Sequence, residues 1–375
     1  MATKRRGSSY PPSSGLNFRP STAEGARWES KGTKPLPERS SVLDVLLTML
    51  LHICRKIMFF DTRKRVLGYL GCLFIISLLA DVAPIPKSYF SRTDNVLNQY
   101  FVKLGWAWTL AAATPFIALT SYTICCGQQH QVIQHLSRMA VATAVWFFCT
   151  SLFAYIEVGY GRCSDKSGVS KKQCISKGLK WQTFDISGHT FILMYSALLL
   201  TEEARTIIGW ERIRDLIRDE HHTRRNIDET TTNSLSGLTD NDFAFLQTRY
   251  DKVTPWVKTF FVLMTVLCII WDLMLLATML YFHNMGEKFL SGLIACFMWY
   301  VTYRGWFSIP NSVPGLPGDG VFRYKETKAS SEPLVKKKGT TQMKVTTFMG
   351  RPLTALRNQD TDKRDNGTSQ SGEYH

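Results

Sequence analysis

The 375-residue sequence predicts an all-α membrane protein in which six transmembrane helices lie between disordered basic N- and C-terminal tails. Residues 66–306 contain several long apolar stretches with few charges, and about 20 such residues in a helix cross the core of a bilayer. Most of the formal net charge of +15 lies in the tails. Residues 1–65 carry 13 Lys and Arg against 5 Asp and Glu, and residues 307–375 carry 11 Lys and Arg against 7 Asp and Glu. The mean hydropathy is close to zero only because polar tails dilute an apolar centre, so a soluble globular protein is excluded.

The segments outside the apolar centre differ in composition. Residues 1–40 are rich in Ser, Pro, Gly and Arg, and we expect a disordered cytosolic tail there and again at 307–375. Within 41–65, the apolar residues of Ser41–Phe60 are interrupted by charged side chains and a histidine. That run is short for a membrane span, so we predict an amphipathic helix lying on the membrane surface.

The centre, 66–306, divides into six candidate spans. They are about Val66–Ala83, Leu104–Ile124, Met139–Ile156, Ile186–Leu200, Trp256–Tyr281 and Phe289–Tyr303. The fourth and the sixth are short, and we expect them to tilt or to thin the bilayer. An even number of spans places both tails on one side, and the basic N-terminus indicates that this side is the cytosol. Residues 84–103 and 157–187 then face the lumen.

The lumenal loop 157–187 departs from the usual charge distribution, because it carries 6 Lys and Arg against 3 Asp and Glu. Either the N-terminal charges fix the orientation and this loop follows, or the loop uses its positive charge to hold an anion. Cys163 and Cys174 lie in the same loop and are candidates for a disulfide in an oxidising lumen, with two free thiols as the alternative.

Two of the eight histidines stand out by position. His189 lies at the start of the fourth span and His283 at the end of the fifth. The chain crosses the membrane twice between them, in opposite directions, so both histidines emerge on the same membrane face. One neutral imidazole can attack phosphorus while a second, protonated imidazole gives its proton to the leaving oxygen. Ser187 and Gly188 suit the start of a helix whose N–H groups favour an anion. The alternatives are interfacial histidines without catalytic function, or metal ligands, for which no completing Cys, Asp or Glu spacing is present.

Several longer motifs also occur in a fixed order along 66–306. They are Pro84-Ile85-Pro86-Lys87-Ser88-Tyr89-Phe90, Asn95-Val96-Leu97-Asn98-Gln99-Tyr100-Phe101-Val102-Lys103, Trp106-Ala107-Trp108-Thr109, Pro115-Phe116-Ile117-Ala118-Leu119-Thr120, Cys149-Thr150-Ser151, Phe184-Asp185-Ile186-Ser187-Gly188-His189 and Tyr281-Phe282-His283-Asn284. In these motifs the chain resembles the fat storage-inducing transmembrane (FIT) family, and within it the type 2 branch. The tails and much of 205–255 lie outside the resemblance.

The resemblance implies a six-span protein of the endoplasmic reticulum membrane, distantly similar to the lipid phosphate phosphatases. It implies an acyl-CoA diphosphatase that hydrolyses fatty acyl-CoA to acyl 4′-phosphopantetheine and adenosine 3′,5′-bisphosphate at the lumenal face. Such an enzyme supports lipid-droplet formation and normal membranes of the reticulum. We expect fatty acyl-CoA, the neutral lipids diacylglycerol and triacylglycerol, and membrane lipids as partners, with no metal, no cofactor and no nucleic acid.

The resemblance also implies roles for single residues. Ser187-Gly188-His189 matches the second phosphatase motif, with His189 as the proton donor, and His283 matches the third-motif nucleophile. Other parts differ: the first phosphatase motif and the Ser-Arg before the third-motif histidine are missing, and Glu287 stands where the phosphatases carry Asp. Glu287 could orient His283, but we interpret it as a solvated polar residue. The phosphate-clamping residues are unassigned, and the candidates by proximity in sequence are Lys180, Lys177 and Arg162.

Two other functions fit the same sequence. One is a phosphatase that acts on phosphatidic acid or a related lipid monoester. The other is a protein without catalytic activity that binds diacylglycerol and triacylglycerol and partitions them within the bilayer. A transporter is a weaker alternative, because the spans show no obvious inverted repeat.

Overall fold

The computed structural model describes residues 42–83, 86, 88–92, 94–164, 170–225, 233–310 and 312–325, and two short strands near the C-terminus. The predicted tail 1–40 and most of the predicted tail 307–375 lie outside the described residues. The chain forms two compact units, 1–56 and 57–375.

The described part of the first unit belongs to helix α1, Val42–Met58. Its apolar and polar residues lie on opposite faces, with Asp44 in the first turn and Arg55 and Lys56 in the last turn. Charges of these signs at these ends stabilise a helix through its dipole. The expected amphipathic helix is therefore present, and its position on a membrane surface stays a prediction.

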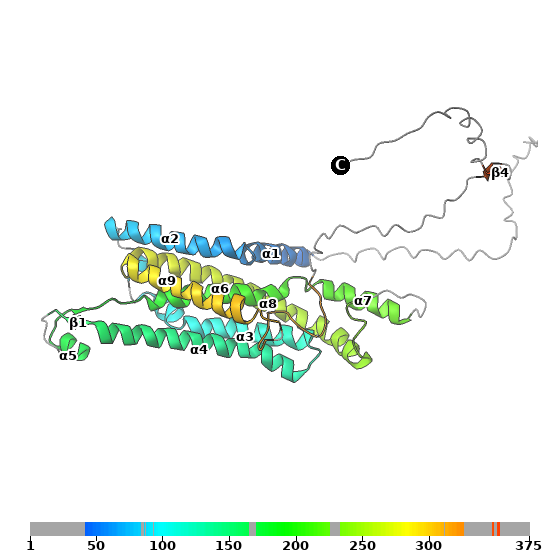
Figure 1. Ribbon diagram of the computed structural model, residues 1–375. Coiled ribbons are helices and arrows are strands. Elements are labelled where there is room, and N and C mark those ends of the chain that lie inside the picture. The colour runs from blue at the N-terminus through cyan, green and yellow to red at the C-terminus, as the bar shows by residue number, and fades with distance from the viewer. Residues whose placement is uncertain are drawn as a thin grey trace, which may run out of the picture. The chain divides into compact units, whose positions relative to one another are not determined.

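The second unit is a bundle whose long helices lie side by side (Figure 1). Its helices are α2 (Thr62–Val82), η1 (Tyr89–Ser91), η2 (Leu97–Val102), α3 (Gly105–Ile124), α4 (Gln129–Tyr160), α5 (Lys171–Ser176), α6 (Gly188–Ala204), η3 (Arg205–Ile207), α7 (Arg212–Arg225), α8 (Asp240–Tyr281), α9 (Met285–Trp299) and η4 (Tyr300–Trp306). Its strands form two short antiparallel pairs, β1 (Arg162–Cys163) with β2 (Trp181–Gln182) and β3 (Thr347–Phe348) with β4 (Arg351–Pro352). Strand β1 and α5 lie at one end of the bundle and α7 at the other (Figure 1).

Each of the six predicted spans overlaps a helix. Met139–Ile156 and Trp256–Tyr281 lie entirely within one, and the other four extend beyond the end of the helix that contains most of them. Among the described helices, α2, α4 and α8 are long and apolar enough to cross a membrane. The helices of the other three predicted spans are either shorter or less apolar. Helices α6 and α9 have only 17 and 15 residues, and several Thr, Ser and Trp side chains lower the mean hydropathy of α3. Helices α4 and α8 extend well beyond their predicted spans, because polar residues continue both helices outside the apolar stretch.

Helix α6 lies at the centre of the core. Every residue from Thr190 to Ala204 is buried, and the helix packs against α3, α8 and α9. Helix α9 approaches closely because Gly292 has no side chain; a Cβ there would stand 2.5 Å from Leu73 and 3.1 Å from Met194. Since α6 carries His189 at its first turn, this packing fixes the position of one candidate catalytic residue.

Polar contacts inside the bundle tie the helices together. Tyr69 on α2 donates a hydrogen bond of 2.5 Å to Asp272 on α8, so this half-buried carboxyl has a partner within the bundle. Arg138 on α4 forms two hydrogen bonds, of 2.8 and 2.9 Å, with Glu203 on α6, and both side chains are buried. Buried charges of this kind require partners, because an unpaired one is costly.

Candidate active site

The structure brings His189 and His283 to the same end of the bundle, as the counting of spans predicts. His189 is the second residue of α6, and His283 lies in the turn between α8 and α9, two residues before α9 begins. The positive charges of the two imidazoles repel each other, and the charge of Lys103 adds to the repulsion at His189. Two helix N-termini therefore meet at the histidines, and helix N-termini favour bound anions.

The backbone at His283 is strained and firmly held. Its φ of +54° is in the left-handed region, which is uncommon for a residue other than glycine and is typical of functional sites. On one side, the Lys288 ammonium group donates a 2.8 Å hydrogen bond to the carbonyl of Met279 in the last turns of α8. On the other side, Asn284 caps α9. These contacts fix the direction in which the imidazole leaves the turn.

Two carboxylates face one nitrogen of His283. Its Nδ1 lies 3.5 Å from Glu287 Oε2 and 3.6 Å from Asp185 Oδ2. These distances are ion-pair distances, longer than a strong hydrogen bond, and such contacts tighten when a substrate binds. An Nδ1–H directed at carboxylates leaves Nε2 as the nitrogen with a free lone pair. The arrangement therefore prepares Nε2 for nucleophilic attack.

The interpretation of Glu287 as a solvated residue is wrong. Glu287 is buried, and its carboxylate accepts 3.1 Å hydrogen bonds from the backbone N–H groups of Asn284 and Asp185. Its position follows from a capping box, in which Asn284 caps the helix and the residue three positions later returns a hydrogen bond. The Asn-x-x-Glu spacing is visible in the sequence, whereas the contact with Asp185, about 100 residues away, is not.

Asp185 differs from Glu287 in its surroundings. Partial burial raises the pKa of the Asp185 carboxyl above its usual value, while the charge of His283 acts in the opposite direction. Its side chain is 48% exposed, against 9% for Glu287. Glu287 is thus the fixed partner of His283, and Asp185 is the accessible one.

The start of α6 shows what Ser187 and Gly188 do. The Ser187 hydroxyl accepts hydrogen bonds from the N–H of Thr190 at 3.3 Å and from its hydroxyl at 3.0 Å. Ser291 on α9 donates a 2.6 Å hydrogen bond to the Ser187 carbonyl. These contacts make Ser187 the N-terminal cap of α6, and its side chain is fully buried. Gly188 is exposed, and a Cβ on it would meet no atom within 4 Å, so the space before the helix is open.

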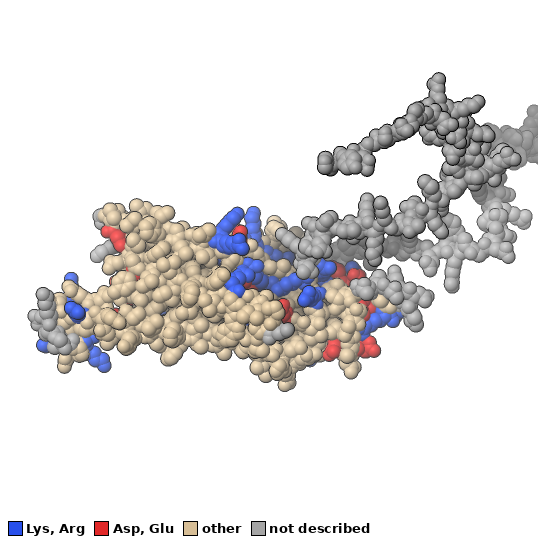
Figure 2. All heavy atoms as spheres, in the orientation of Figure 1, with Lys and Arg blue, Asp and Glu red and all other residues tan. Residues whose placement is uncertain are grey.

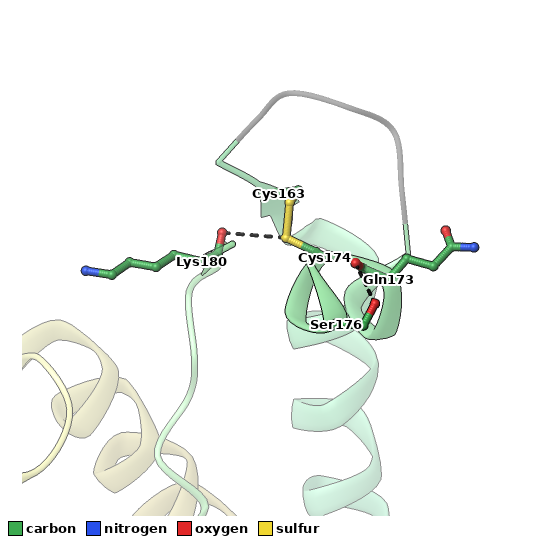
Figure 3. Close-up of a disulfide and its surroundings, with 5 residues drawn as sticks. All are labelled: Cys163, Gln173, Cys174, Ser176 and Lys180. Atoms are coloured by element: carbon green, nitrogen blue, oxygen red, sulfur yellow. Dashed lines mark hydrogen bonds between the residues drawn. A yellow bond between two sulfur atoms is a disulfide. The ribbon is translucent and has the colours of Figure 1, made fainter. Parts of the chain in front are cut away.

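The loop before α6 is closed by a disulfide between Cys163 and Cys174 (Figure 3). The short pair of β1 and β2 joins its two ends, and Cys174 Sγ lies 3.7 Å from the carbonyl oxygen of Lys180. The Lys180 side chain points away from the disulfide (Figure 3). The pair expected from the sequence is therefore present.

The structure places the three proposed phosphate-clamping residues on the exposed surface of this loop. Within the described part of the chain, Arg162, Lys177 and Lys180 form no hydrogen bond or ion pair with either histidine. Two other cations act on the site: Lys103 on His189, and Lys171, which pairs with Glu157, on Asp185. Lys171 belongs to the basic loop 157–187 and Lys103 to 84–103, and the sequence predicts that both segments lie on the membrane face of the histidines.

Comparison with known proteins gives a consistent result. Residues 86–303 match the profile of the family described as fat storage-inducing transmembrane protein. The Drosophila melanogaster protein named acyl-coenzyme A diphosphatase FITM2 is 45% identical over 336 residues, covering 87% of this chain and 79% of that protein. The Homo sapiens protein of that name is 36% identical over 249 residues, covering 64% and 81%. The Caenorhabditis elegans one is 29% identical over 286 residues, covering 76% and 93%. No solved structure matches the chain.

Proposed function

The chain belongs to the fat storage-inducing transmembrane protein family, and on this premise we propose that it is a fatty acyl-CoA diphosphatase. It hydrolyses acyl-CoA to acyl 4′-phosphopantetheine and adenosine 3′,5′-bisphosphate. The observation that carries the proposal is the meeting of His189, His283 and the carboxylates of Asp185 and Glu287 at two helix N-termini. Relatives named for this activity cover most of the chain, which supports the same conclusion.

In the proposed reaction the two imidazoles have different roles. His283 Nε2 attacks one phosphorus of the pyrophosphate, so a P–N bond forms as the bond from that phosphorus to the bridging oxygen breaks. His189, protonated, gives its proton to this leaving oxygen. Water then attacks the same phosphorus, the P–N bond breaks, and His189 takes the proton from the water. The sum is one water consumed and two phosphate products.

The carboxylates and the helix ends assist this sequence electrostatically. Glu287 and Asp185 stabilise the positive charge that develops on His283 during the attack. The open space before Gly188 lets phosphate oxygens approach the first N–H groups of α6, and Lys103 adds positive charge nearby. We assign phosphate binding to these groups and leave Arg162, Lys177 and Lys180 to attract the anion at longer range.

The membrane arrangement belongs to the same proposal. The chain crosses the endoplasmic reticulum membrane six times, with α3, α6 and α9 completing the spans of α2, α4 and α8. Both tails lie in the cytosol and the histidines at the lumenal surface, where a disulfide forms readily. Acyl tails and neutral lipids lie between the helices, and turnover of acyl-CoA supports lipid-droplet formation.

The substrate is tested with the purified full-length chain in detergent. Incubated separately with oleoyl-CoA and with phosphatidic acid, the chain is expected to release adenosine 3′,5′-bisphosphate from the first. Faster release of inorganic phosphate from phosphatidic acid would favour the lipid phosphate phosphatase. Turnover of neither lipid, with retained binding of diacylglycerol, would favour the lipid-partitioning protein.

A further inference from the structure

A cavity lies far from the histidines. It has a volume of about 830 Å³, and its walls come from the start of α2 and from the ends of α6 and α9 with the segments that follow them. Both α6 and α9 begin at the histidines, so the cavity lies at the other end of these helices. The 17 residues of α6 alone separate the two places by about 25 Å. The cavity is thus distinct from the active site.

Three arginines from three different elements line this cavity: Arg63 on α2, Arg205 in η3 and Arg304 in η4. Basic side chains gather on the surface in this part of the molecule (Figure 2). The fold uses Arg205 and Arg304 only in part. Each pairs with Glu202, at 3.0 and 2.7 Å, so two guanidinium groups share one carboxylate.

The arginines of the cavity differ in how firmly the fold holds them. Arg205 is held from two sides, because its Nε lies 3.0 Å from Glu202 Oε2 and its Nη2 donates a 2.6 Å hydrogen bond to Thr62 in the cavity wall. The Arg63 side chain is exposed, and among the described residues the structure gives it no hydrogen bond or ion pair. Guanidinium groups held in this way match the oxygens of a phosphate.

The remaining walls are aromatic and aliphatic. Phe59, Val66, Trp299 and Tyr300 line the cavity beside the arginines. Val66 is also where the apolar run of α2 begins, so the cavity opens where that span meets the membrane surface. Trp and Tyr are typical of this depth in a bilayer. A ligand that fills the cavity therefore presents an anionic group to the arginines and an apolar part to the membrane.

We propose that this arginine-lined cavity binds the phosphate headgroup of an anionic membrane phospholipid, on the membrane face opposite the histidines. The lipid's acyl chains follow the apolar surface of α2 into the bilayer. The site lies outside the catalytic reaction and gives the enzyme a contact with the lipid composition of the other leaflet.

The test measures binding to the full-length chain carrying His189→Ala and His283→Ala, so that no lipid is turned over. Dihexanoyl phosphatidic acid, dihexanoylglycerol and adenosine 3′,5′-bisphosphate are titrated separately, and bound ligand is counted by native mass spectrometry. Arg63→Gln is added to the same chain because its side chain holds no other part of the fold. The matched control is Lys64→Gln, which removes the same charge from the next residue, outside the cavity lining.

We expect Arg63→Gln to weaken phosphatidic acid binding about tenfold, the loss of one charge-assisted contact, and Lys64→Gln to change it less than twofold. Dihexanoylglycerol, which lacks the phosphate, should bind at least tenfold more weakly. Equal effects of the two substitutions would overturn the proposal, because binding would then follow general surface charge. Equal binding of dihexanoylglycerol would also overturn it, as would binding of the bisphosphate without the phosphatidic acid.

Discussion

Replacing Glu287 by glutamine tests how the turn between α8 and α9 prepares His283. The substitution keeps the size of the side chain and removes its charge. Glu287 accepts hydrogen bonds from two backbone N–H groups and lies 3.5 Å from His283 Nδ1. A glutamine amide has one acceptor oxygen, so one of the two N–H groups loses its acceptor, and the imidazolium loses the nearer of two carboxylates.

Both consequences have a magnitude. One buried N–H without a partner costs about 1–3 kcal/mol of unfolding free energy. The loss of kcat is smaller than it would be if Glu287 were the one carboxylate beside His283, because Asp185 remains 3.6 Å from the same nitrogen. We expect kcat to fall about 10- to 100-fold, which corresponds to about 1.4–2.7 kcal/mol of transition-state stabilisation. KM should change little, since Glu287 is buried and does not meet the substrate.

The assay follows adenosine 3′,5′-bisphosphate released from oleoyl-CoA by the purified chain, with thermal unfolding measured on the same preparation. Asp185→Asn is the matched control, because it removes the other carboxylate without removing an acceptor of backbone N–H groups. Combined, the two substitutions should reduce kcat more than either alone. A folded Glu287→Gln chain that keeps its full kcat would refute the role assigned to this carboxylate, as would a double variant within threefold of the unchanged chain.

Three further predictions concern neighbouring residues. Gly188→Ala should leave the free energy of unfolding unchanged or raise it by up to about 1 kcal/mol, since a Cβ there meets no atom. Activity should fall at least fivefold, because phosphate oxygens need that space. An unchanged kcat/KM would show that the substrate does not approach this helix end. Cys163→Ser should destabilise the loop by about 2–3 kcal/mol, and the measurement is faster proteolysis between β1 and β2. If chemical reduction of the unchanged protein does not speed proteolysis there, the disulfide does not stabilise the loop. Burial raises the pKa of Asp185, so its charged form is disfavoured in the folded state: its contribution is most favourable below the ordinary Asp pKa and is lost as pH rises through the raised value. Asp185→Asn should therefore unfold at an equal or higher temperature than the unchanged chain at pH 7, with no difference at pH 3, and a lower midpoint at pH 7 would contradict the assigned shift.

Much of the bundle could be predicted because apolar periodicity and length report directly on helices in a membrane. The shared location of His189 and His283 followed from counting spans, which needs no knowledge of how the helices pack. The ends of α4 and α8 could not be predicted in this way. Polar residues continue these helices by ordinary helix propensity, which leaves no signal in a search for apolar runs.

The immediate surroundings of the histidines were harder to predict. Glu287 looks like a polar residue beside a turn, and only the packing of α6 on α9 shows that it accepts the N–H of Asp185. Lys103 and the Tyr69 partner of Asp272 likewise come from segments that are distant in the sequence. Contacts between spans depend on how the helices are arranged around α6, and a single sequence does not specify that arrangement.

The most direct test of the central claim is product formation by three chains: unchanged, His283→Ala and His189→Ala. Each is purified at full length and incubated with oleoyl-CoA, and the products are separated by chromatography. The unchanged chain should release acyl 4′-phosphopantetheine and adenosine 3′,5′-bisphosphate in equal amounts, and each substitution should lower the rate at least a thousandfold while the chain stays folded. Pyrophosphate cleavage that persists in either folded variant would contradict the assignment of the two histidines, and release of free fatty acid and CoA would contradict the reaction itself.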